Sequence, residues 1–167
     1  EEDVTDKLIV VNSHSTLLFF TNKGKIFAKK AYRIPEAGRT AKGGHLANIL
    51  ELAEGEKVTA IISAANFSET EYLTMVTRQG VIKRTAMSEF AYQRKGGKIA
   101  IGLDEGDELV SVLLTEGQSD IIIASADGCA VRFTEKGART MGRTARGVRG
   151  ITLRGDDYVA GVIAIEE

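Results

Sequence analysis

The sequence has few cysteines, prolines and histidines, and these absences remove several classes of protein. Among 167 residues there is one cysteine, one proline and no tryptophan. A single cysteine excludes an internal disulfide framework and a cysteine-cluster metal site, and we expect Cys129 to be a small packing residue in a strand. The two histidines, His14 and His45, are too far apart in sequence for a metal-ligand motif. No apolar run approaches the about 18 residues of a membrane span, so the cytoplasm is the expected compartment.

Catalytic signatures are missing as well. The sequence contains no GxSxG, HExxH or Walker-type phosphate-binding run. The composition is that of a folded domain, with 43% hydrophobic residues, 27% charged residues and a net charge of -1. Eighteen glycines against one proline favour many tight turns, which is typical of β-structure. We therefore expect a single all-β domain without catalytic residues of its own.

The chain is built from a repeated pattern with a period of about 50 residues. Three segments read as strand, turn and strand: LLFFTNKGKIFAKK, YLTMVTRQGVIKRT and DIIIASADGCAVRFTE. Their turn glycines are Gly24, Gly80 and Gly128. Each hairpin is followed by a basic cluster with glycine, an acidic turn and a last apolar run. Four strands in a unit of this length are typical of a propeller blade.

These repeats divide the whole chain into blades. We expect residues 1–16 to end a preceding blade, and blades to follow over about 17–66, 67–117 and 118–167. Three repeats are fewer than the about 4 to 8 blades that close a ring. The predicted architecture is therefore an open, propeller-like arc of about three four-stranded blades.

Positive charge follows the same period, although the total charge is close to zero. The windows 22–45, 76–98 and 132–154 carry net charges of +6, +5 and +6 and hold 20 of the 22 lysines and arginines. A strand of 5 or 6 residues spans about 17–20 Å, which exceeds the Debye length of about 8–10 Å at 0.1–0.15 M salt. Acidic turns at the other end of the strands would therefore barely screen a cationic edge. A repeated positive edge predicts a repeated negative partner, and duplex DNA fits best.

Contacts to phosphates need cations on segments whose backbone can approach the DNA closely. The strongest candidates lie in the glycine-containing clusters: Lys42, Arg94, Lys95, Lys98, Arg146 and Arg149. Secondary candidates lie just before these clusters or on the second strand of each hairpin: Arg39, Arg139, Arg143, Lys29, Lys30, Lys83, Arg84 and Arg132. Contacts of this kind position DNA without reading its bases. No catalytic or metal-binding residues are expected.

Two other functions stay open on this pattern. A propeller rim can instead hold an acidic protein partner, which needs a compact patch with apolar anchors such as Ile34, Met87 or Met141. A propeller enzyme needs convergent carboxylates, and the acidic loops 104–108 and 154–157 are the available source. Their recurrence at the same place in every repeat favours ordinary turns.

Three longer segments carry a family resemblance: LLFFTNKGKIFAKKAYRIPEAGRTAKGGHLANIL, EFAYQRKGGKIAIGLDEGDELVSV and MGRTARGVRGITLRGDDYVAGV. They are similar to the C-terminal domain of the bacterial DNA gyrase A protein, over essentially the whole chain. The stretch RIPEAGRTAKG at 33–43 favours gyrase over the related topoisomerase IV protein, which stays the alternative. The resemblance implies a β-pinwheel, whose neighbouring blades exchange a strand and whose basic rim wraps duplex DNA.

The resemblance also implies partners and chemistry outside this segment. In the family, the rest of gyrase A joins gyrase B in an enzyme that uses ATP and Mg to introduce negative supercoils, so no cofactor is expected here. The family carries a box of the form Gln-Arg-Arg-Gly-Gly-Lys-Gly in its first blade. The nearest match runs from Gln93 to Lys98 and is followed by Ile99 instead of glycine. We therefore expect the box proper to lie upstream of this chain, and further blades to follow Glu167.

Overall fold

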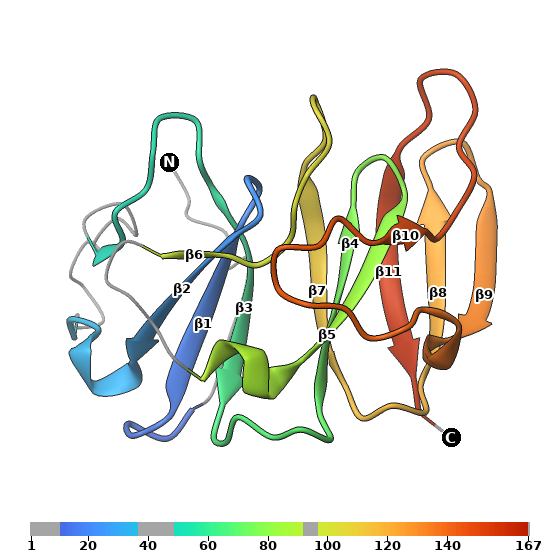
Figure 1. The fold of residues 1–167 in the computed structure, drawn as a ribbon. Coiled ribbons are helices and arrows are strands. Elements are labelled where there is room, and N and C mark those ends of the chain that lie inside the picture. The colour runs from blue at the N-terminus through green and yellow to red at the C-terminus, as the bar shows by residue number, and fades with distance from the viewer. Residues whose placement is uncertain (1–10, 37–48, 92–96, 167) are drawn as a thin grey trace.

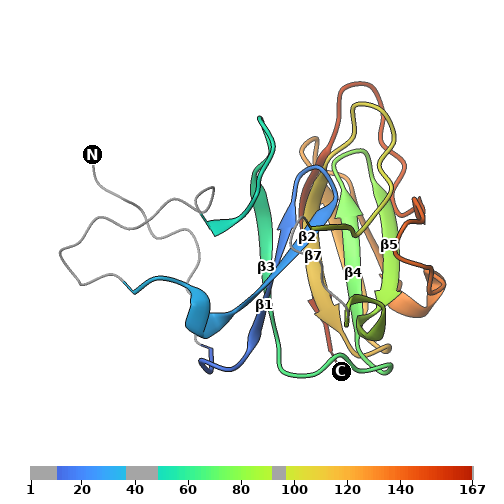
Figure 2. The same ribbon diagram turned by 60° about the vertical axis from the view of Figure 1, so that its left-hand side comes forward.

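The computed structural model describes residues 11–36, 49–91 and 97–166, and these residues form three antiparallel sheets. The sheets stand next to one another in sequence order, as Figures 1 and 2 show from two sides. Eleven strands and three short 3-10 helices make up this part of the chain. The all-β, repeated architecture expected from the sequence is confirmed.

Each sheet is centred on a hairpin. The hairpins pair β1 (Thr16–Thr21) with β2 (Lys25–Lys30), β4 (Tyr72–Thr77) with β5 (Val81–Ala86), and β8 (Asp120–Ser125) with β9 (Ala130–Thr134). Their turn glycines Gly24, Gly80 and Gly128 have φ angles of 77°, 90° and 89°. Glycine adopts this left-handed region without the steric cost that a Cβ brings. The predicted turn glycines therefore have the role that the sequence assigned to them.

The last apolar run of each repeat adds a strand on the other side of its hairpin. These strands are β3 (Val58–Ala64), β7 (Leu109–Thr115) and β11 (Val159–Ile165), which pair with β1, β4 and β8. Short 3-10 helices follow the hairpins: η1 (Ala31–Arg33), η2 (Met87–Phe90) and η3 (Glu135–Gly137). The backbone therefore repeats as the sequence does.

The fourth strand of a sheet comes from the following repeat. β6 (Lys98–Ile99) belongs to the second repeat and pairs with β2, whereas β10 (Val148–Arg149) belongs to the third repeat and pairs with β5. This arrangement confirms the strand exchange between neighbours. The third sheet has three strands among the described residues, not the expected four, because β10 is used by the second sheet.

Glycine lets each exchanged segment lie directly on the neighbouring hairpin turn. The carbonyl oxygen of Gly24 accepts hydrogen bonds from two amides that follow β6, at 2.8 and 3.2 Å, and that of Gly80 does the same after β10, at 2.8 and 3.3 Å. A Cβ at Gly24 would lie 2.7 Å from the carbonyl oxygen of Ile101, and one at Gly80 would lie 2.8 Å from that of Ile151. Both glycines are therefore required by close approach as well as by φ.

Apolar clusters between neighbouring sheets form the core. Phe20 and Leu73 belong to a cluster that joins the first two sheets, and Val76 and Ile121 belong to one that joins the second and third. Cys129 is exposed, which corrects the expectation that it packs in a strand. It follows the third hairpin turn, where no described strand covers the outer edge of β9. No helix in the described ranges is long and apolar enough to cross a membrane.

Candidate nucleic-acid interface

The structure describes most of the predicted DNA contacts. Four of them, Lys42, Arg94, Lys95 and Arg39, lie outside the described residues. Lys98 and Arg149 lie on the exchanged strands β6 and β10, which are edge strands of their sheets. The exchanged strands therefore bring basic residues of the clusters to the edges of two neighbouring sheets.

Close approach of the backbone fixes the segment before β10. Gly147 has a φ of 97°, and a Cβ there would lie 2.5 Å from the carbonyl oxygen of Ile82. The equivalent glycine before β6 is Gly97, with a φ of 78°, where a Cβ would lie 2.8 Å from the ring of Phe27. Side chains larger than hydrogen do not fit either position without movement. The glycines of the basic clusters are thus packing residues that hold the cations next to them against the sheets.

Basic segments of the second and third repeats contact one another. The amide of Gly102 donates a 3.0 Å hydrogen bond to the carbonyl of Ala145, and the guanidinium of Arg143 donates a 3.4 Å bond to the carbonyl of Ile99. In Figure 1 the loop between η3 and β10 crosses the second sheet towards the segment that follows β6. The cations on these two contacting segments are Lys98, Arg139, Arg143, Arg146 and Arg149, and together we call them the basic band.

One carboxylate partly neutralises this band. The guanidinium of Arg146 lies 3.0 Å from the carboxylate of Asp104, and the two side chains are 74% and 50% exposed. A solvent-exposed pair of this kind is worth at most about 1 kcal/mol. A phosphate can therefore replace the carboxylate at little cost.

Two predicted contacts, Lys83 and Arg84, are buried, and the structure corrects them. Lys83 is 0% exposed and Arg84 is 8% exposed, so neither side chain reaches the surface. Strand alternation predicts that one of two neighbouring side chains points outward. Here both are covered, because residues of the loop after η3 lie along β5: Thr140 bridges to Arg84, and the amide of Met141 donates to the Arg84 carbonyl at 2.9 Å.

The ammonium of Lys83 binds two backbone carbonyls from different repeats. Its Nζ donates a 2.7 Å hydrogen bond to the carbonyl of Ala100, next to β6, and a second bond to the carbonyl of Arg143 in the following repeat. Burial and the nearby Arg143 guanidinium lower the pKa of Lys83 to about 8, although Glu89 acts in the opposite direction. The lysine is therefore still mostly charged at neutral pH.

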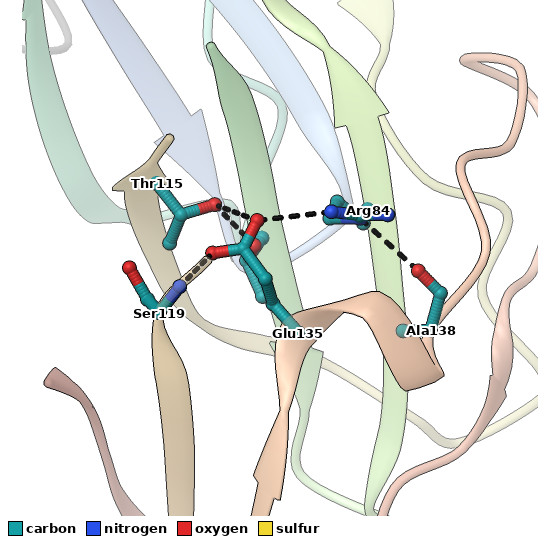
Figure 3. A network of polar contacts seen from close by, with 6 residues as sticks. Arg84, Thr115, Ser119, Glu135 and Ala138 are labelled. Atoms are coloured by element: carbon teal, nitrogen blue, oxygen red, sulfur yellow. Dashed lines mark hydrogen bonds and ion pairs between the residues drawn. The ribbon is translucent and has the colours of Figure 1, made fainter. Parts of the chain in front are cut away.

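Arg84 takes part in a buried polar network at the same junction (Figure 3). Its Nη1 lies 3.0 Å from Oε1 of Glu135, and its Nε donates to the carbonyl of Ala138 at 3.1 Å. Glu135 is 0% exposed and also accepts hydrogen bonds from the Thr115 hydroxyl, at 3.2 Å, and the Ser119 amide, at 3.1 Å. The network joins the second and third repeats through side chains rather than through the exchanged strand alone.

The remaining candidates lie on second hairpin strands. Lys29 is half-buried, and exposed Lys30 donates a 3.4 Å bond to the carbonyl of His14. Arg132 is exposed and lies 2.8 Å from the carboxylate of Asp120 on the neighbouring strand. The first contact holds Lys30 against the segment that precedes its repeat, and the second holds Arg132 within its own repeat. A role of the three residues in DNA binding stays a prediction.

The acidic turns cap hairpins. The carboxylate of Asp107 accepts a 2.9 Å bond from the amide of Gln79, and that of Asp157 accepts a 3.0 Å bond from the amide of Asp127. Each acid belongs to the turn before a last strand, and each amide lies in the hairpin turn of the same repeat. Within the described ranges, no group of three or more His, Cys, Asp or Glu side chains is placed to hold a metal ion. The acidic loops therefore have a structural explanation, as the sequence favoured.

Comparisons with known proteins agree with this geometry. The model of the DNA gyrase C-terminal domain family, described as a β-propeller, matches residues 15–65, 71–116 and 119–166. The DNA gyrase A protein of Halalkalibacterium halodurans is 49% identical over 152 residues, which cover 91% of this chain and 18% of that protein. The chain therefore spans less than a fifth of the length of this curated relative.

Two solved structures share the fold. The C-terminal domain of DNA topoisomerase IV has a TM-score of 0.87 and 30% identity, and the match covers 94% of this chain and 49% of that one. The DNA gyrase A C-terminal domain has a TM-score of 0.75 and 26% identity, with 93% and 50% covered. Because the family model matches each of the three repeats, and the repeats exchange strands as described, the chain belongs to the DNA gyrase C-terminal domain family.

Proposed function

We propose that this chain binds duplex DNA along the basic band and curves it, as the DNA-wrapping part of a bacterial DNA gyrase A protein. The observation that carries this proposal is the contact between successive basic segments, in which the Gly102 amide bonds to the Ala145 carbonyl at 3.0 Å. That contact brings together two segments that carry cations of successive repeats, which supports a shared phosphate-binding surface. The periodicity of the sequence predicts such a surface, but it does not show that the basic segments contact one another.

The chemistry of the band suits phosphates rather than bases. Arg146 and Arg149 are exposed and lie beside backbone that is fixed by close packing. Guanidinium groups bind phosphate oxygens in fixed geometry, and contacts to phosphates carry no sequence information directly. Sequence preference then follows bendability, because curving 20–30 bp by 40–90° costs on the order of 1–6 kcal/mol and depends on sequence.

In the whole protein, the curved DNA would serve strand passage. We infer that gyrase B and the rest of gyrase A supply the strand-cleaving and ATP-dependent steps in the cytoplasm, and that this segment presents DNA for negative supercoiling. Topoisomerase IV stays the second candidate, because its C-terminal domain has the same fold with a TM-score of 0.87. Supercoiling of relaxed plasmid by the reconstituted holoenzyme, against relaxation alone, separates the two.

A protein partner would use different side chains on the same surface. Of the apolar anchors considered from the sequence, Met87 is buried and Ile34 and Met141 are half-buried. Ile99 and Val148, on β6 and β10, are exposed at 49% and 39%. Changing both to serine would weaken a protein contact and leave phosphate binding in place, so retained DNA affinity in this variant supports the DNA proposal.

Salt dependence of DNA binding tests the proposal. Fluorescence anisotropy of a labelled duplex should show affinity that falls about 10³- to 10⁵-fold between about 50 and 200 mM salt, if roughly 6 to 10 phosphates are engaged. The Arg146→Ala, Arg149→Ala variant should lower the slope of log K against log salt by about 0.9 per lost contact. Lys57→Ala removes an exposed cation outside the basic windows and should leave the slope unchanged. A flat salt response would contradict the proposal.

A further inference from the structure

Lys83 stands where the other two repeats have apolar residues. Phe27, Lys83 and Val131 each lie three residues after a hairpin turn glycine, on β2, β5 and β9. Phe27 is 2% exposed, so the position belongs to the interior of the blade. An apolar side chain therefore fits this site in two repeats, and packing alone does not account for a lysine in the third.

The Lys83 Cβ lies beside its cluster glycine as the Phe27 ring lies beside the equivalent one. A Cβ at Gly147 would lie 3.0 Å from the Lys83 Cβ, just as a Cβ at Gly97 would lie 2.8 Å from the Phe27 ring. The difference lies at the tip of the side chain. The Lys83 ammonium continues to the carbonyls of Ala100 and Arg143, whereas the phenyl ring has no donor.

Those two carbonyls belong to the two segments that form the basic band. Ala100 follows Lys98 and Ile99 in the segment exchanged to the first sheet, and Arg143 lies in the loop that leads to β10. Hydrogen bonds from a charged donor are roughly twice as strong as those between neutral groups. A buried ammonium that binds both carbonyls therefore fixes the distance between the two basic segments.

Stability does not explain the ammonium. Burying a charge carries a desolvation penalty, and replacing buried ionic groups by apolar residues of similar volume is often neutral or stabilising. The lowered pKa of Lys83 is consistent with that penalty. We therefore look for the role of the ammonium in the arrangement of the two segments that Lys83 binds, rather than in the free energy of unfolding.

We propose that Lys83 is a positioning residue of the basic band, whose buried ammonium ties the Ala100 and Arg143 carbonyls together and so sets the spacing of the cations of two repeats for DNA. This inference rests on the proposed function and extends it to a residue that does not itself contact DNA. Lys83→Met is the direct test, because methionine keeps the length and apolar stem. Val131→Met is the matched control at the equivalent position of the third repeat.

Amide hydrogen exchange measures the effect of the Lys83 hydrogen bonds on the junction in the absence of DNA. In Lys83→Met the amides of Gly102 and Met141, which bond across the junction, should exchange at least tenfold faster. The amide of Val159, which bonds to the Arg78 carbonyl, should keep its rate as an internal reference. Duplex affinity at constant salt should fall three- to tenfold, with no change in Val131→Met. Unchanged exchange at Gly102 and Met141 in a folded Lys83→Met protein would overturn the proposal.

Chemical rescue separates the ammonium from the side-chain volume. Lys83→Cys in a Cys129→Ser background leaves one thiol, which is alkylated in the unfolded state with 2-bromoethylamine or with iodoacetamide before refolding. With 2-bromoethylamine the thiolate displaces bromide and gives an aminoethyl thioether that ends in an ammonium. With iodoacetamide it displaces iodide and gives a carbamidomethyl thioether that ends in a neutral amide. The aminoethyl product should restore slow exchange and DNA affinity, and the amide product should not. Equal behaviour of the two products would overturn the proposal.

Two outcomes separate DNA binding by the chain from the positioning role of Lys83. If the unmodified chain binds no duplex DNA, the proposed function falls and the positioning role falls with it, whatever the exchange rates show. If the unmodified chain binds DNA and Lys83→Met exchanges faster but binds equally well, Lys83 is structural and only the positioning role is overturned.

Discussion

The two junctions between neighbouring sheets have the same backbone and different side chains. At both, the carbonyl of a turn glycine, Gly24 or Gly80, accepts two amide hydrogen bonds from the exchanged segment. At three equivalent positions the first junction is apolar, with Phe27, Ala28 and Met87, and the second is charged, with Lys83, Arg84 and Glu135. Backbone hydrogen bonds and glycines therefore define the repeat, and side chains decide how each junction responds to mutation and pH.

The largest difference should follow from breaking the buried ion pair of the second junction. Glu135→Ala leaves the Arg84 guanidinium buried without its carboxylate, which should lower the free energy of unfolding by about 3–5 kcal/mol. The exposed pair of Arg132 and Asp120 should lose no more than about 1 kcal/mol in Asp120→Ala. Urea unfolding of both variants makes this measurement. Similar losses in the two variants would contradict the difference in burial.

Two of the three charged positions of the second junction can be given the residues of the first. The double variant Arg84→Ala, Glu135→Met copies the apolar residues of the first junction, so no charge is left without a partner. It should recover at least half of the stability lost in Glu135→Ala, because exchanging a buried ion pair for apolar residues is often neutral. A double variant as unstable as Glu135→Ala would mean that the charges are needed for the fold itself.

Replacing the cluster glycine should also cost more free energy of unfolding at the second junction than at the first. Gly147→Ala places a Cβ 2.5 Å from a backbone oxygen at a φ of 97°, whereas Gly97→Ala meets the ring of Phe27 at 2.8 Å. The left-handed backbone costs about 1–2 kcal/mol at either site, and the backbone clash adds more at Gly147 because a ring moves more easily than a carbonyl. We expect losses of about 2–4 and about 1–2 kcal/mol in thermal or urea unfolding. The reverse order would show that the first junction is the tighter one.

Stability at the second junction should depend on pH. The folded-state pKa of Lys83 is about 8 against an ordinary value of 10.5, so between these values the unfolded chain binds the proton and the folded chain does not. The free energy of unfolding must then rise with pH across this window. The contribution from Lys83 is about 2 kcal/mol between pH 7 and pH 9.5, at about 1.36 kcal/mol per unit. The parent should gain this amount over Lys83→Met, and parallel pH profiles would contradict the burial of the charge.

The smallest effect should come from the acidic side chain on the band. Asp104→Asn removes the partner of Arg146 and one negative charge near the proposed phosphate path. Duplex affinity should rise two- to threefold at low salt and by less at high salt, because salt screens exposed charges. Glu54→Gln, an exposed acid in the equivalent turn of the first repeat, gives the matched charge change away from the described band. Equal gains in the two variants would mean that only net charge matters.

The sequence predicted the hairpins and turn glycines because their signals are local. The role of Gly24, Gly80 and Gly128 depends only on the residues of their own turns. The burial of Lys83 and Arg84 depends on a loop about 60 residues further along the chain, and alternation within β5 contains no sign of it. The exposure of Cys129 likewise depends on which strand covers the edge of β9. The exchange of strands was expected only through the family resemblance, and side-chain contacts between repeats are where reasoning from the residues failed. The basic band lies at such a contact.

Plasmid topology tests most directly whether the basic band curves duplex DNA. The chain is added to relaxed plasmid with a relaxing topoisomerase, and the linking number is measured after deproteinisation. Curvature around the band predicts trapped supercoils of one sign, which decrease with salt and are lost in Arg146→Ala, Arg149→Ala but kept in Lys57→Ala. Saturating DNA binding with no change in linking number would contradict it.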